Sequence, residues 1–209
     1  MLIDLLSQLV MEQAILKTPT TYKKWPEPVA TSSPAASNHS VMITGTGQKD
    51  FKYKIEKWGV VLANVSDFQT KVAETLNDER GWARAGLTFT ETSGDDYDLI
   101  IALSDAATLD TISGCSGDLS CTTWHNQVII NDLRWRGGTA ASNAAGMSQR
   151  DYQHMVVNHE VGHWLGHYAH EESCPNGGLA PIMLQQSTGM RGCDSFNAWP
   201  LDWELWTNK

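Results

Sequence analysis

The chain has 209 residues with a formal net charge of −9 at pH 7, and 41% of its residues are hydrophobic. This length suits one domain with a tail, or at most two small domains, and the apolar residues suffice for a sizeable core. The acidic balance argues against a nucleic-acid partner, which normally meets a basic face, and no run of about 18 apolar residues exists to span a membrane.

The first forty residues differ in composition from the rest. Residues 1–17 have the leucine spacing of a short amphipathic helix, and they lack the positive start of a signal peptide. Residues 18–40 are rich in Thr, Ser, Pro and Ala and are typical of a linker. We expect one folded domain over 41–209, divided into an N-terminal subdomain (41–166) and a C-terminal subdomain (167–209).

The folded part alternates strand and helix patterns. Apolar alternation and short apolar runs predict strands over 51–62, 87–91, 97–103 and 127–131. Ser66-Asp67 predicts the start of a helix that runs to about Asn77, and Ser104-Asp105 predicts a short helix toward Ile112. Residues after 166 show little periodicity. The fold class we expect is therefore α+β, with a mixed sheet of four to five strands and two main helices.

Four cysteines form two locally spaced pairs, neither of which has C-x-x-C spacing. Three pairings are formally possible, and thiolate metal ligands or buried thiols are the alternatives. The spacing favours disulfides Cys115–Cys121 and Cys174–Cys193. Disulfides persist in oxidising compartments, so this pairing predicts a secreted or extracytoplasmic protein, although no clear signal peptide precedes the domain.

The segment 159–170 carries the strongest chemical signal. It contains His159-Glu160-Val161-Gly162-His163, an H-E-x-x-H motif, after a helix start at Ser148 that fits a capping box. Two histidines four residues apart lie on one helix face and can hold one zinc ion. Glu160 flanks that face, where it can accept a proton from a zinc-bound water.

A third ligand must follow this helix. Gly166 can adopt a left-handed conformation, end the helix and turn the chain back toward the metal. His167 and His170 then both lie within reach, and a carboxylate such as Glu171, or a water, is a further alternative.

The motif resembles the HExxHxxGxxH pattern of the metzincin clan of zinc endopeptidases, with Met183 in Ala180-Pro181-Ile182-Met183 at the place of its methionine turn. A closer similarity, from about residue 51 to 200, is to a bacterial family of exported zincin-like domains of unassigned function. The resemblance implies a zincin-like fold and one catalytic zinc ion. The clan pattern places the third histidine at Ala169, one residue before His170, and because a loop absorbs such an insertion we choose His170.

The resemblance implies peptide hydrolysis, with Glu160 as general base and His159, His163 and His170 as ligands. Weaker candidates for oxyanion contacts are Tyr168, Gln185 and Gln186. The strand 127–131 is our candidate for the edge that pairs with an extended peptide or protein substrate. We expect a monomer, and the alternative functions are a non-catalytic zinc-containing binding module and a zinc hydrolase of a non-peptide, cell-wall amide.

Overall fold

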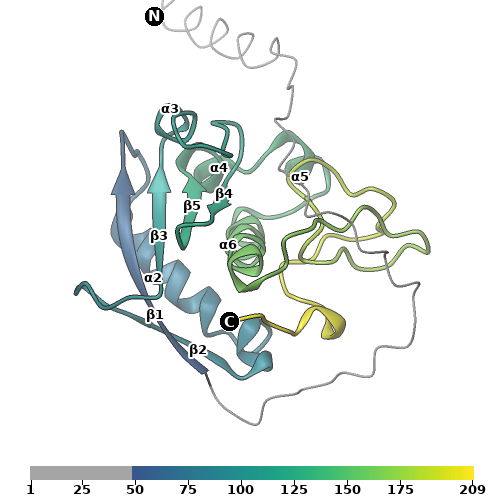
Figure 1. Ribbon diagram of the computed structural model, residues 1–209. Helices are drawn as coiled ribbons and strands as arrows, with labels where there is room; N and C mark the ends of the chain where they lie inside the picture. Colours follow the sequence, from purple (N-terminus) through teal and green to yellow (C-terminus); the bar gives the residue numbers. More distant parts are fainter. Residues whose placement is uncertain (1–48) are drawn as a thin grey trace, which may run out of the picture. The chain divides into compact units, whose positions relative to one another are not determined.

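The computed structural model describes residues 49–209, and in these residues five strands form one mixed sheet (Figure 1). The strands are β1 (Lys49–Trp58), β2 (Leu87–Glu91), β3 (Leu99–Ser104), β4 (Cys121–Thr123) and β5 (Gln127–Asn131). Their order across the sheet is β2-β1-β3-β5-β4, in which the first four run parallel and β4 runs antiparallel to β5. The predicted α+β class with a mixed sheet is confirmed.

Two long helices cover one face of the sheet. Helix α2 (Val65–Leu76) and helix α6 (Gln149–Leu165) share one continuous core with β1, β2, β3 and β5. The aromatic core includes Phe51, whose ring meets the Trp164 ring edge-on at 4.8 Å between centroids. Every residue of β3 is buried, and its apolar side chains pack into the hydrophobic clusters on both faces of the sheet.

The opposite face carries a smaller cover. The short helix α3 (Ala106–Leu109) and the loop closed by Cys115–Cys121 pack against Ile100, Ala102 and Ile129. Side chains alternate along a strand, so Cys121 points to this face while Thr122 points to the face that holds α6. The first disulfide therefore fixes a strand that is hydrogen-bonded, through Thr122, to the helix with the H-E-x-x-H motif.

Several predicted boundaries need correction. The predicted strand 51–62 ends at Trp58, because Gly59 has a left-handed φ of +71° and turns the chain. Val60 and Leu62 are consequently exposed, at 74% and 71%. The predicted strand 97–103 begins two residues later, at Leu99.

Three short elements were not predicted, namely β4, α4 (Asp132–Gly137) and α5 (Ala140–Ala144). Each is too short to show a period, and α4 instead begins with a side-chain cap, in which Asn131 accepts hydrogen bonds from Leu133 and Arg134. The strand β4 also overturns a prediction. It occupies the edge of the sheet, so the strand 127–131 (β5) is an interior strand between β3 and β4.

The part of the chain after α6 is irregular, as predicted. It contains one 3-10 helix, η2 (Asp202–Glu204), and isolated bridges that join Glu171 to Leu184 and Leu179 to Ser195. The disulfide Cys174–Cys193 closes its largest loop, so both predicted disulfides are present in the structure.

The predictions for residues 1–40, a helix followed by a linker, and the domain start at 41 lie outside the described residues. Within 49–209, no helix combines the length and the apolar content needed to cross a bilayer.

Candidate metal centre

Helix α6 positions the H-E-x-x-H motif. Ser148 caps its first turn by accepting a hydrogen bond from the Asp151 N–H at 3.1 Å, and Gly166, with φ +118°, ends it. The apolar side chains of Val157, Val161 and Leu165 on this helix are fully buried in the core. The opposite face is covered too, because the segment around Met183 packs over it.

Three imidazoles converge beside this face. The ligating nitrogens of His159, His163 and His170 all lie within 4.8 Å of one another, and the two Nε2 atoms of His163 and His170 are 3.0 Å apart. Two nitrogens bound to one tetrahedral zinc ion at about 2.0–2.1 Å lie roughly 3.3 Å apart. The spacing therefore fits a shared ion. His159 is buried, His163 partly exposed and His170 exposed, so solvent reaches the cluster from one side.

Hydrogen bonds orient two of these rings. His159 Nδ1 lies 2.7 Å from the carbonyl oxygen of Ile182, and His163 Nδ1 lies 2.6 Å from the carbonyl oxygen of His167. A carbonyl only accepts, so each Nδ1 carries the proton and each Nε2 keeps a free lone pair for a metal.

Burial also keeps the imidazoles neutral, which is the form that binds a metal. It lowers the pKa of His159 far below its ordinary value, and the neighbouring His163 and His170 add to this effect. Loss of hydration lowers the pKa of His163 to about 4, and it does the same for the ring of His170, whose Nε2 faces His163 although the residue as a whole is exposed.

The other proposed third ligands lie apart from the cluster. His167 is buried in the opposite direction, where its Nε2 lies 3.0 Å from the Trp206 carbonyl oxygen and its ring packs 3.8 Å from the Trp206 ring. Glu171 contributes its backbone N–H to the Met183 carbonyl oxygen, and its carboxylate is not part of the cluster. Of the alternatives weighed from the sequence, the structure thus brings only His170 to His159 and His163.

Glu160 is buried next to the cluster, and a residue that the sequence did not single out holds it. The hydroxyl of Thr122, in the edge strand β4, lies 2.9 Å from Glu160 Oε2 and 2.8 Å from the Glu160 carbonyl oxygen. Burial raises the pKa of Glu160 to about 8, and the hydrogen bond with Thr122 opposes that rise. Nothing in the Cys121–Thr123 triplet marks Thr122, because its partner lies 38 residues away.

Met183 packs against helix α6 at Gly162. Its side chain is buried, and a Cβ at Gly162 would fall 2.5 Å from its sulfur. Gly162 is therefore the residue between the two helical histidines that lets Met183 approach the helix backbone.

The three weaker candidates have other surroundings. Gln186 is buried with its amide bound to the Pro181 and Asn197 carbonyl oxygens and to the Asn197 N–H, so it is not free to meet a substrate. Tyr168 is 44% exposed, and its ring lies 5.3 Å from that of Trp124. Gln185 is half-buried, and its backbone carbonyl accepts a hydrogen bond from the hydroxyl of Thr188.

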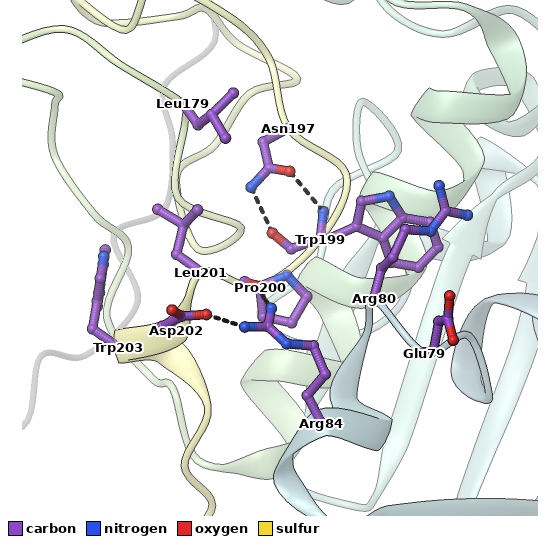
Figure 2. Close-up of a pocket in the computed structure, with 10 residues that line it drawn as sticks. All are labelled: Glu79, Arg80, Arg84, Leu179, Asn197, Trp199, Pro200, Leu201, Asp202 and Trp203. Carbon is purple, nitrogen blue, oxygen red and sulfur yellow. Dashed lines mark hydrogen bonds and ion pairs between the residues drawn. The ribbon is translucent and has the colours of Figure 1, made fainter. Parts of the chain in front are cut away.

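A surface pocket of about 690 Å³ lies elsewhere (Figure 2). Its lining includes none of the residues that the sequence placed in the site. Both arginines in its wall are occupied, since Arg80 pairs with Asp78 and stacks on Trp199, and Arg84 pairs with Asp202. The pocket carries no free cation that would select an anionic ligand.

A mixed α+β fold and a cluster of three imidazoles define a candidate metal-binding protein. Residues 30–204 match a family described as "Protein of unknown function (DUF3152)", and the chain belongs to this family. Four chains of solved structures match. Among them is an archaemetzincin from Methanopyrus kandleri, at 12% identity and a TM-score of 0.36, over 78% of this chain and 90% of that chain. No curated protein sequence matches significantly.

Proposed function

We propose that the protein is a secreted zinc-dependent endopeptidase, in which His159, His163 and His170 hold zinc and Glu160 is the general base. The observation that carries this proposal is the convergence of three neutral imidazoles next to a buried glutamate. Burying a carboxylate costs free energy, and a protein that only binds zinc gains nothing from one beside the imidazoles.

The donor set supports a catalytic rather than a structural zinc site. Structural sites are closed by four protein ligands, whereas catalytic sites use three and leave a position open. Within the described residues the cluster holds three ligating groups, and His170 lies on the solvent side. Zinc, when bound, supplies Lewis-acid chemistry, since it makes water more acidic and polarises a carbonyl.

Glu160 is suited to move the proton of that reaction. Its pKa of about 8 is close to the neutral pH at which a general base is most effective, and a divalent cation nearby would oppose the rise and favour the ionised carboxylate. The hydroxyl of Thr122 can donate to the ionised carboxylate. It can also accept from the protonated form while it donates to the Glu160 carbonyl oxygen, so it holds the side chain in both states.

The substrate would bind along β4. This strand is the edge of the sheet, and Thr122 within it touches Glu160, so a peptide that pairs with β4 would pass directly beside the imidazoles. The residues Cys121–Thr123 replace 127–131 in this role. Two disulfides fit an oxidising compartment, which supports export.

The test combines metal content with cleavage. Zinc per chain would be measured on purified protein, and cleavage of a mixed peptide library would be followed with and without a chelator. We expect one zinc per chain and cleavage that the chelator abolishes and added zinc restores. Zinc without cleavage of any peptide would favour the binding module or a non-peptide amide substrate, and a chain that binds no zinc would overturn the proposal.

A further inference from the structure

Glu204 is a buried carboxylate that the proposed reaction does not use. Its residue exposure is 0%, although it lies near the C-terminus in the 3-10 helix η2. Three backbone N–H groups donate to it, those of Ile182 at 2.9 Å, Met183 at 2.9 Å and Leu201 at 2.8 Å. Burial raises its pKa to about 7, and these hydrogen bonds oppose the rise.

Two of the three donors belong to the turn that touches the imidazoles. The Ile182 N–H meets Glu204, and the Ile182 carbonyl oxygen lies 2.7 Å from Nδ1 of His159. The Met183 N–H also meets Glu204, and the Met183 carbonyl oxygen accepts the N–H of Glu171, the residue after His170. One carboxylate therefore fixes the segment that orients His159 and anchors the loop of His170.

The third imidazole is held by a different turn, which reaches Glu204 through the contact of His167 with Trp206. Nδ1 of His163 lies 2.6 Å from the His167 carbonyl oxygen, in the turn that ends α6. Loss of the Glu204 carboxylate should therefore act most directly on His159 and His170 and least on His163.

The segment that carries Glu204 is itself tethered to the N-terminal part. Arg84 donates to the Pro200 carbonyl oxygen at 3.0 Å and pairs with Asp202, as Figure 2 shows. These contacts fix the chain on the N-terminal side of Glu204, which limits where its carboxylate can point.

We propose that Glu204 is a positioning residue for the metal centre, acting on His159 and His170 through Ile182 and Met183. This inference rests on the zinc site of the proposed function. Groups that orient metal ligands from outside typically change metal affinity 10- to 100-fold when they are removed. A carboxylate suits the role because its two oxygens accept hydrogen bonds on both sides, whereas an amide would turn its NH2 toward one of the donors.

The test compares Glu204→Gln with Asp132→Asn in the full chain. Asp132 is a matched control, because it is also a buried carboxylate that accepts backbone hydrogen bonds, from Leu62 and Ala63, outside the candidate metal centre. The zinc Kd would be measured by competition with a chromophoric chelator. The absorption spectrum of the cobalt(II)-loaded protein would report ligand geometry, and urea unfolding of the metal-free proteins would report stability.

We expect Glu204→Gln to weaken zinc binding 10- to 100-fold and to alter the cobalt(II) spectrum. Asp132→Asn should lower stability but leave the zinc Kd and the spectrum as in the parent. If the parent binds zinc and Glu204→Gln binds it equally tightly, the inference is overturned and the zinc site stands. If the parent binds no zinc, the proposed function falls, and the inference falls with it.

A second variant keeps the test decisive if Glu204→Gln does not fold. Arg84→Gln removes the tether at Pro200 and Asp202 from the outside of the molecule and should weaken zinc binding several-fold. An unchanged zinc Kd in Arg84→Gln would then overturn the inference.

Discussion

The part of the chain up to Gly166 and the part after it reach order by different means. Before Gly166, backbone groups are paired within a sheet and within capped helices, and apolar faces pack together. After it, side chains form many of the hydrogen bonds to backbone groups. Asn197 donates to the Ala180 carbonyl oxygen, and Glu204 accepts from the N–H groups of Ile182 and Met183. Irregular backbone can be buried only when such partners exist, so the second part depends on a few polar side chains.

The candidate metal centre draws on both parts. His159 and His163 come from the regular helix, which presets their spacing, and His170 and Met183 come from the irregular part. A change in the first part that spares His159, His163 and Arg84 should therefore affect chemistry with little effect on the metal, whereas a change in the second should loosen the metal itself. Four predictions test this difference.

The largest effect should follow from Glu160→Gln, a change within the regular helix. Removing the general base should lower kcat/KM by roughly 10²- to 10⁴-fold while one zinc per chain is retained. Peptide cleavage and metal content would be measured on the same preparation. A variant that cleaves as fast as the parent would exclude Glu160 as the base.

The two disulfides compare the two parts directly. Replacing Cys174 and Cys193 by serine opens a loop of 19 residues and should cost about 3 kcal/mol of unfolding free energy together with zinc affinity. Replacing Cys115 and Cys121 opens a loop of 6 residues and should cost about 2 kcal/mol with the zinc Kd unchanged. Urea unfolding and chelator competition measure both quantities, and equal zinc affinities in the two variants would contradict the comparison.

A third prediction concerns pH and a buried histidine on the core side of α6. Nδ1 of His154 lies 2.9 Å from the Thr75 hydroxyl, and burial lowers its pKa from 6.5 to about 4. The unfolded chain therefore binds a proton below pH 6.5 that the folded chain excludes, so this contribution to stability is full above pH 6.5 and is lost as the pH falls toward 4.

In metal-free protein, His154→Gln should reduce the loss of stability between pH 6.5 and 4 by about 1–2 kcal/mol relative to the parent. Urea unfolding at several pH values measures this slope. Identical slopes in the two proteins would show that His154 is not responsible.

The smallest effect should come from Thr122→Val, which removes the hydroxyl that holds Glu160. The loss of one hydrogen bond should lower kcat/KM about threefold to tenfold, with the zinc Kd unchanged. Thr122→Ser keeps the hydroxyl and should retain the parent rate. Equal rates in the serine and valine variants would mean that the hydroxyl does not position Glu160.

Much of this site could be predicted because its signals are local. The four-residue spacing of His159 and His163, the cap at Ser148 and the turn at Gly166 are each contained within one helix. The strands 87–91 and 127–131 were predicted with their observed boundaries, because each is an uninterrupted run with turn residues at its ends.

The predictions that failed concerned pairings and contacts that no local pattern marks. The edge strand β4 has three residues and exists because β5 pairs with it, so no period marked it, and the substrate edge was assigned to β5 instead. Thr122 and Glu204 gain their roles from contacts with residues 38 and about 20 positions away. No motif in the adjacent sequence indicates either residue.

The sequence by itself thus determined the helix, two of its imidazoles and the glutamate beside them, because local spacing on a helix sets these, and it favoured the cysteine pairing that the structure contains. Only the tertiary structure shows that His170, rather than His167, lies beside His159 and His163, since the direction of each ring depends on what packs against it. The ring of His167 packs against Trp206, and the ring of His170 lies beside those of His159 and His163. The same holds for the edge strand and for Glu204, whose places follow from packing between distant segments.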